Sequence, residues 1–175
     1  MAEPSVQISL PKVQVKLRSA YDGGASPPRT YRLGNLTDQS SGWVWAVRDD
    51  NRFSLTWTLE AVGPEATDFT IIATGDWRLT NWSNQAFMRE AQQQVSAQWR
   101  GEGYRDGGGG LSVRIKSVQD PTRYLCLYTD DHGIILPETN ACNLNDTPTL
   151  QNAMWRPDLV SGSQGILDRM FPDQS

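Results

Sequence analysis

The sequence contains little of what metal and nucleophile chemistry requires. Its 175 residues include one histidine, His132, and two cysteines, Cys126 and Cys142. It has no CxxC or HExxH spacing and no GxSxG elbow, so the usual zinc-site motifs and the hydrolase nucleophile motif are missing. We therefore expect a protein without a metal, without a cofactor and without enzymatic activity.

The chain is also poor in lysine and in long apolar runs. Only three of its 16 basic residues are lysines, and 20 acidic residues bring the net charge to -4. Nucleic acid is not an expected partner, because a protein that binds the phosphate backbone needs a concentrated basic face. No apolar run is long enough to span a membrane, and the N-terminus lacks the pattern of a secretory signal. We expect a cytoplasmic protein, or one secreted without a recognisable signal peptide.

Seven tryptophans are many for this length, and they reveal an internal repeat. Three similar segments begin at Tyr31, Trp77 and Tyr124, and these anchors are 46 and 47 residues apart. An alternating apolar run, typical of a half-buried strand, precedes each anchor, and a second strand-like string follows it. Each unit then closes on a tryptophan strand, and a large ring at the same place in each unit predicts a core layer. The three closing tryptophans are Trp57, Trp99 and Trp155.

Four short strands in each of three units predict an all-β chain of twelve strands. Six strands closed into a barrel and capped by three hairpins would hide the strand edges, and this arrangement is the β-trefoil. We expect one domain at 1–160, with pseudo-repeats of about 47 residues at about 10–62, 63–105 and 106–160. The helix formers between Asn84 and Gln98 are interpreted as strands because of their place in the repeat.

A C-terminal tail at 161–175 follows the third unit. Its four large apolar residues have partial helical spacing, which predicts a segment docked on the barrel or on a second subunit of a homodimer. These residues are Ile166, Leu167, Met170 and Phe171. Deleting residues 163 to 175 is expected to lower the melting temperature or to change the oligomeric state.

The third unit, RYLCLYTDDHGIILPETNAC, resembles the ricin B-type lectin repeat. In that family a Cys-Leu-Asp stretch and a polar turn precede an apolar strand, a second cysteine and a Gln-x-Trp strand. Cys126, Cys142 and Trp155 take the corresponding places here. The resemblance implies a β-trefoil that binds glycans, and it implies a disulfide between the two cysteines if the chain is in an oxidising compartment. In the cytosol the two thiols would stay reduced.

The chain departs from the family pattern at two kinds of position. The Gln of the closing strand is replaced by Leu55, Ala97 and Ala153. The Asp that binds galactose in the family aligns with Gly34, Thr80 and Tyr128. The resemblance therefore supports the predicted fold more strongly than it supports a sugar specificity, and it indicates no particular sugar.

Three groups of residues in and around the predicted turns have the composition of a sugar site. Sugars are recognised by an exposed aromatic ring together with carboxylate or amide groups that bind the hydroxyls. Trp43 and Trp45 are expected on one face of a strand, with Val44 on the other. Together the three groups would make a multivalent lectin. The first group is Asp38, Trp43 and Trp45, the second is Asn81, Trp82 and Asn84, and the third is Tyr128, Asp130, Asp131, His132 and Asn140.

Two alternative functions stay open. A β-trefoil protease inhibitor would insert a protruding loop, from Asp22–Thr30 or Arg100–Gly110, with Arg29 or Arg105 entering a trypsin-like pocket. A toxin-targeting or partner-docking trefoil would instead bind another protein through its aromatic or apolar patches.

Overall fold

Strands make up most of the regular structure in the computed structural model. It describes residues 9–20, 30–36, 42–47, 53–65, 67–73, 77–83, 85–90, 94–127, 139–145 and 153–174. The elements in chain order are β1 (Lys12–Ser19), β2 (Arg32–Leu36), β3 (Gly42–Trp43), β4 (Trp45–Val47), β5 (Phe53–Ser54), β6 (Trp57–Ala61), β7 (Asp68–Ile72), β8 (Arg78–Trp82), β9 (Gln85–Arg89), a 3-10 turn η1 (Val95–Ala97), β10 (Trp99–Arg105), β11 (Leu111–Ser117), β12 (Tyr124–Leu127), β13 (Thr139–Asn145), β14 (Trp155–Ser161) and α1 (Gln164–Met170). The prediction of an all-β chain is confirmed.

Six of these strands close into a barrel. β1 pairs with β6, β6 with β7, β7 with β10, β10 with β11, β11 with β14, and β14 returns to β1. Every one of these pairs is antiparallel. Closure pairs strands that would otherwise present unpaired backbone groups at an edge.

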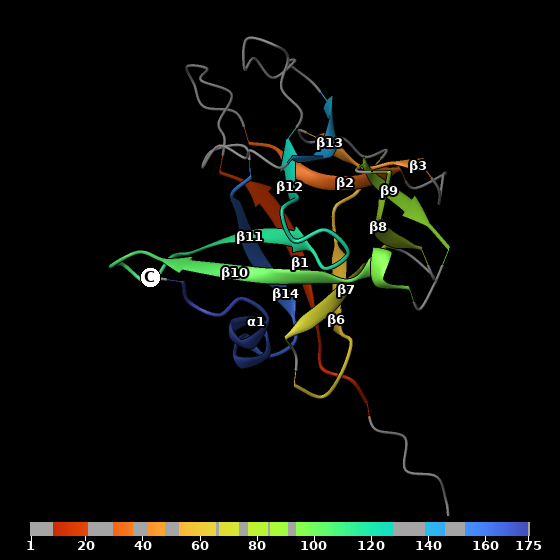
Figure 1. Ribbon diagram of the computed structural model, residues 1–175. Helices are drawn as coiled ribbons and strands as arrows, with labels where there is room; N and C mark the ends of the chain where they lie inside the picture. Colours follow the sequence, from red (N-terminus) through yellow and green to blue (C-terminus); the bar gives the residue numbers. More distant parts are fainter. Residues whose placement is uncertain are drawn as a thin grey trace, which may run out of the picture.

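Three hairpins lie at one end of the barrel, opposite α1 (Figure 1). They consist of β2 with β4, β8 with β9, and β12 with β13. The hairpins also pair with one another, since β3 joins β9 and β13 joins β4. The order barrel strand, hairpin, barrel strand thus occurs three times along the chain, as the repeat predicts.

The strand prediction needs two local corrections. The third strand of the first unit is divided at the buried Val44 into β3 and β4, and the additional β5 pairs with the end of β2. Of the segment from Asn84 to Gln98, β9 is a strand, whereas Val95–Ala97 forms η1. That tight turn buries Ala97 and leads the chain into β10.

The three closing tryptophans form the predicted core layer. Each ring is at most 1% exposed, and each indole Nε1–H donates to a leucine carbonyl on the second strand of its own unit. The donor and acceptor pairs are Trp57 with Leu33 at 2.9 Å, Trp99 with Leu79 at 3.1 Å and Trp155 with Leu125 at 3.0 Å. The leucines are equally spaced along the chain. One buried interaction therefore repeats three times.

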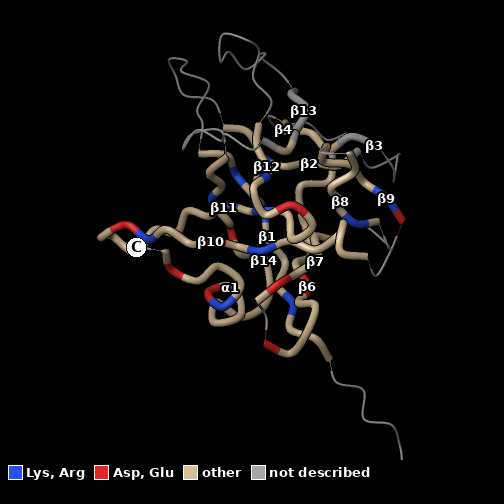
Figure 2. The backbone as a smooth tube through the Cα atoms, viewed as in Figure 1, with Lys and Arg blue, Asp and Glu red and all other residues tan. Residues whose placement is uncertain are grey.

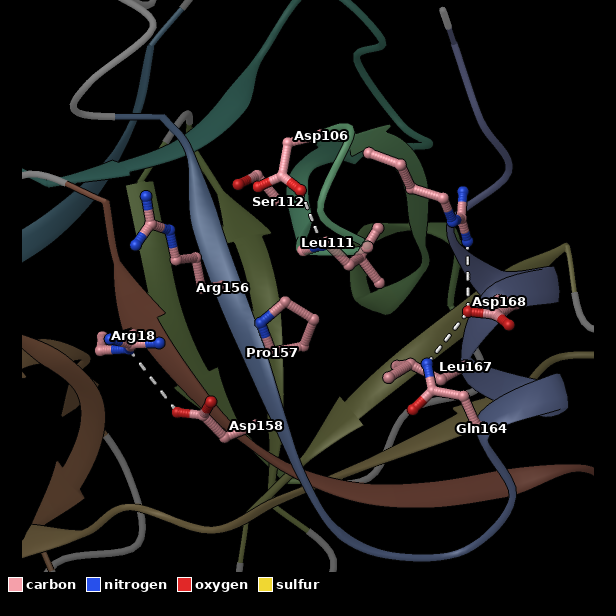
Figure 3. Close-up of a pocket in the computed structure, with 13 residues that line it drawn as sticks. Arg18, Asp106, Leu111, Ser112, Arg156, Pro157, Asp158, Gln164, Leu167 and Asp168 are labelled. Atoms are coloured by element: carbon pink, nitrogen blue, oxygen red, sulfur yellow. Dashed lines mark hydrogen bonds and ion pairs between the residues drawn. The ribbon is translucent and has the colours of Figure 1, made fainter.

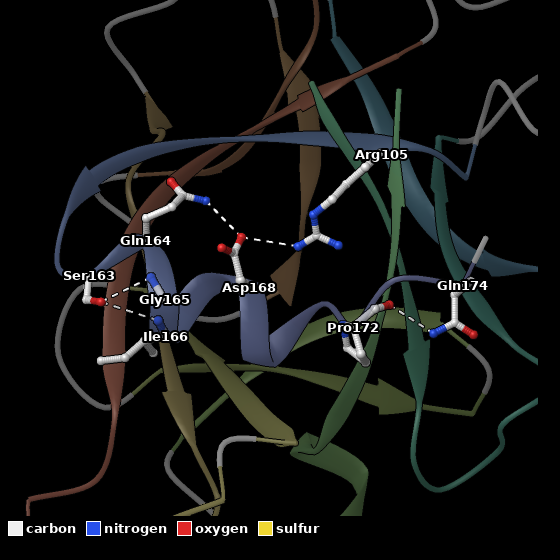
Figure 4. A network of polar contacts seen from close by, with 8 residues as sticks. All are labelled: Arg105, Ser163, Gln164, Gly165, Ile166, Asp168, Pro172 and Gln174. Atoms are coloured by element: carbon white, nitrogen blue, oxygen red, sulfur yellow. Dashed lines mark hydrogen bonds and ion pairs between the residues drawn. The ribbon is translucent and has the colours of Figure 1, made fainter. Parts of the chain in front are cut away.

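The C-terminal tail docks on the barrel of its own chain. Ser163 caps α1, because its hydroxyl oxygen accepts from the amides of Gly165 and Ile166 (Figure 4). Leu167, Met170 and Phe171 are buried in the core. The ring of Phe171 packs against that of Phe69, with 5.4 Å between the centroids. The segment after α1 then bonds to Gly103 of β10 through the Pro172 carbonyl and the Gln174 amide, each at 2.9 Å.

Replacing Trp99 by phenylalanine is expected to lower the free energy of unfolding by about 2–3 kcal/mol. The Leu79 carbonyl would lose its buried donor, and the smaller ring would leave a cavity. Denaturant unfolding followed by circular dichroism measures the change. The matched control is Trp82→Phe at an exposed position, which should stay within about 0.5 kcal/mol of wild type. Equal unfolding midpoints for the two variants would contradict the central role of the buried bond.

Gly101→Ala is expected to destabilise the protein by about 1–3 kcal/mol. An added methyl group would overlap the Met170 carbonyl oxygen and the Phe171 ring, so the docked tail would have to move. Thermal unfolding measures the effect. Gly107→Ala is the control, because nothing lies within 4 Å of a Cβ there. A melting temperature for Gly101→Ala as high as that of the control would show that the tail does not pack closely on β10.

Candidate functional site

The three predicted sugar-binding groups differ in how many of their residues the structure describes. In the third group, Tyr128, Asp130, Asp131 and His132 lie outside the described residues. Asn140 belongs to β13, opposite Ala46 of β4, but its side chain is not described. The third group therefore stays a prediction.

The first group is separated by the break between β3 and β4. Trp43 lies opposite Phe87 of β9, whereas Trp45 is half-buried and lies opposite Gly34 of β2. The two tryptophans therefore belong to different strand pairs, which replaces the prediction of one continuous strand. Asp38 lies outside the described residues, and the side chain of Trp43 is not described.

The second group centres on the tip of the β8–β9 hairpin. Trp82 and Gln85 are opposite each other, and Ser83 between them has a φ of 52°, as a two-residue hairpin turn requires. Trp82 is 47% exposed. Its ring lies against Phe87, with 4.8 Å between the centroids, and the Arg89 guanidinium is 5.7 Å from its centroid. An exposed indole is thus held in place from two sides.

Asn81 does not join Trp82 on the surface. Its side chain is buried, and its amide nitrogen donates to the hydroxyl oxygen of Ser117 on β11 at 3.1 Å. Consecutive residues of a strand point to opposite faces, so the exposure of Trp82 turns Asn81 inward. Asn81 is therefore a packing residue, and Asn84 lies outside the described residues.

A second polar and aromatic surface, which the sequence did not reveal, covers β10, β11 and β12. We call it the tyrosine face. The Arg114 guanidinium lies 5.8 Å from the ring centroid of Tyr104 and 5.6 Å from that of Tyr124. Beside this stack, Lys116 Nζ donates to Glu102 Oε2 at 3.1 Å. The cation–π contacts hold the ring of Tyr104 on β10 and that of Tyr124 on β12 against one guanidinium.

Both tyrosines on this face have a raised pKa. Burial is the main cause for each, and the negative charge of Glu102 adds to it. The positive charge of Arg114 acts in the opposite direction. Both phenols are therefore neutral at neutral pH and able to donate hydrogen bonds.

Most of the segment Arg100–Gly110, for which the sequence predicts a protruding loop, belongs to strand β10. Of Arg100–Gly110, only the turn at 106–110 lies outside a strand, and the Asp106 carboxylate holds that turn by accepting from the amides of Gly108 and Gly110. Arg105 Nη2 donates to Asp168 Oδ1 at 3.2 Å. An inhibitory arginine at this loop is therefore not supported. Arg29 lies outside the described residues.

Charge is dispersed over the described surface. Basic and acidic positions are interspersed along the barrel strands and α1 (Figure 2). The described residues contain no group of three or more side chains suited to hold a metal ion. Within the same part of the chain, no helix has the length and apolar character needed to cross a membrane.

Comparison with known proteins identifies the fold and no family. No protein-family model matches the chain, and no curated protein matches its sequence. Similar solved structures include a mosquitocidal holotoxin, with a TM-score of 0.64 and 12% identity over 90% of this chain and 18% of the toxin chain. A GH43 β-1,3-galactosidase gives 0.53 and 11% over 82% of this chain and 26% of the enzyme chain. An interleukin-1β mutant from Gallus gives 0.58 and 9% over 85% and 96%.

The extent of these matches differs. The chain spans only a small part of the toxin and of the galactosidase, but it corresponds to nearly the whole of interleukin-1β. At these identities the likeness describes the backbone arrangement alone, because one fold serves many functions.

Glu102→Gln is expected to lower the pKa of both Tyr104 and Tyr124. The substitution removes a negative charge that opposes ionisation, while burial continues to raise the pKa of both phenols. Alkaline titration of the tyrosinate absorbance measures the shift, and Tyr104→Phe and Tyr124→Phe assign it. Glu65→Gln, at an exposed turn position, is the control.

The same raised values predict the direction of the stability change at high pH. Unfolded tyrosines lose their protons first, so the free energy of unfolding contributed by these groups falls as pH rises above about 10. A titration curve identical in wild type and Glu102→Gln would refute the influence of the carboxylate.

Proposed function

We propose that this chain is a non-enzymatic β-trefoil lectin of the ricin B-like type, which binds glycans through its surface. Three observations support the trefoil: the closed barrel, the three hairpins at one end, and the tryptophan–leucine bond repeated in each unit. The near-complete correspondence with interleukin-1β, itself a trefoil, supports it as well.

The exposed indole of Trp82 is the observation that carries the carbohydrate proposal. A sugar presents an apolar C–H face that packs against a flat ring, and a ring already held by Phe87 and Arg89 loses little freedom on binding. Gln85 lies directly across the hairpin and is exposed, so its amide is available for hydroxyl groups. The hairpin tip therefore supplies both parts of sugar recognition.

This site differs from the one that the family uses. Thr80 occupies the place of the galactose-binding Asp in the second repeat, but it is buried and its hydroxyl donates to the Phe87 carbonyl at 2.7 Å. Gly34, in the same place of the first repeat, is also buried and has no side chain to contribute. We therefore propose that the sugar binds at Trp82, the last residue of the same strand, β8.

The likeness to one part of a mosquitocidal holotoxin supports a second candidate, a targeting module that docks on a protein. In both candidates the chain acts as a binding unit. They differ in the ligand, since a targeting module would retain its partner when no sugar is present.

Trp82→Ala is expected to weaken glycan binding at least tenfold, a loss of about 1.4 kcal/mol of binding free energy. A glycan array identifies the sugar, and calorimetry with the single best uncharged sugar then measures the affinity without avidity. Val62→Ala is the matched control, because Val62 is 44% exposed and is an apolar side chain outside this hairpin. Trp82→Phe should retain part of the affinity.

Two outcomes would contradict the proposal. One is an array on which the wild-type protein binds no glycan, and this result would favour the targeting module. The other is a Trp82→Ala variant that binds the selected sugar as tightly as the Val62→Ala control does.

A further inference from the structure

A cleft of about 590 Å³ lies along β14, between the β10–β11 turn and α1 (Figure 3). It exists because β11 and β14 are paired only at Val113 and Trp155. Past this pair, β14 continues along β1, whereas the first residues of β11 pair with β10. α1 forms one wall through Gln164, Leu167 and Asp168. The volume falls within the range of about 300–1,000 Å³ that is typical of small-ligand pockets.

Three carboxylates line this cleft, those of Asp106, Asp158 and Asp168, and two of them accept hydrogen bonds within the protein. Asp168 Oδ1 accepts from Arg105 at 3.2 Å and from Gln164 at 3.0 Å (Figure 4). Asp106 accepts from two backbone amides of its own turn. These acids are thereby neutralised or hydrogen-bonded, and they fix the walls.

The arginines of β1 and β14 have fewer partners. Arg18 and Arg156 are directly opposite each other in the β1–β14 pair, and both line the cleft. Like charges at opposite positions of an antiparallel pair repel each other. Asp158 Oδ2 lies 3.7 Å from Arg18 Nε, which is an ion pair without a hydrogen bond, and this buried Nε has no acceptor. Among the described residues, Arg156 has no acidic partner.

Arg18 and Arg156 bring two positive charges to one part of the cleft, and an anion bound there would reduce their repulsion and give the buried Arg18 Nε an acceptor. Buried donors without acceptors destabilise a fold, and guanidinium groups match the two oxygens of a carboxylate. The cleft is also lined by Ser112 and Gln164, which have polar side chains, and by the apolar residues Leu111 and Pro157. Such a lining suits a ligand that carries hydroxyl groups as well as a negative charge.

We infer that the cleft along β14 binds an acidic saccharide, with its carboxylate at Arg18 and Arg156 and its hydroxyls toward Ser112 and Gln164. The inference rests on the proposed function, because it assigns a sugar to a second site. The two sites use different residues, since Trp82 does not line this cleft.

Calorimetric titration with glucuronate and with N-acetylneuraminate tests this inference, with glucose and N-acetylglucosamine as neutral counterparts. Arg156→Gln should weaken binding of the acidic sugars at least tenfold and leave the circular dichroism spectrum unchanged. Arg169→Gln is the matched control, because this exposed arginine of α1 does not line the cleft. Trp82→Ala should bind the acidic sugars like wild type.

Three results would overturn the inference: no binding of either acidic sugar, equal binding of the neutral counterparts, or equal affinity of Arg156→Gln and Arg169→Gln. Displacement of the acidic sugar by an equal concentration of inorganic sulfate would likewise overturn it, in favour of a simple anion site. Failure of the proposed function gives a different result, because the Trp82→Ala variant would then bind the uncharged glycans of the array as wild type does, whatever the cleft binds.

Discussion

The hydrogen bond from a buried indole to a leucine carbonyl, made once in each unit, is the interaction on which the architecture depends. A ring as large as that of Trp57 fills the space between a barrel strand and its hairpin, but it brings a polar N–H into the core. The Leu33 carbonyl satisfies that donor without requiring water or a second polar side chain. Trp99 and Trp155 make the same hydrogen bond in the other two units, so the last strand of every unit is joined to its second strand.

These repeated residues are the part of the fold that the sequence makes predictable. The aromatic spacing identified three units and the buried tryptophans, whereas the glycines of β10 were misinterpreted as a loop. Glycine stands at positions 101 and 103 of this strand because the docked tail approaches too closely to leave room for a side chain. That reason is invisible locally, since Met170 and Phe171 follow some seventy residues later in the chain. The apolar spacing of the tail predicts that it docks, but it does not predict that the tail docks on β10.

The candidate sites were less predictable, because they depend on strand parity and on pairing between distant segments. Composition placed Asn81 and Trp82 in one group, although adjacent residues of β8 must point to opposite faces. The tyrosine face requires the register that sets Glu102 opposite Arg114, and the cleft requires the one that sets Arg18 opposite Arg156. Neither register follows from local sequence.

The separation of the core from these surfaces explains how the chain departs from the ricin-like pattern without losing the fold. The tryptophan layer stabilises the barrel from inside, so the position of the family's sugar-binding carboxylate can hold Thr80, which is buried and donates to the carbonyl of its cross-strand partner Phe87. The proposed binding chemistry lies at outward positions that the core does not constrain. At Trp82 it would be an apolar ring, and at Arg18 and Arg156 two neighbouring positive charges. Because Arg18 and Arg156 repel each other across β1 and β14, their position directly opposite each other supports the proposed anionic ligand.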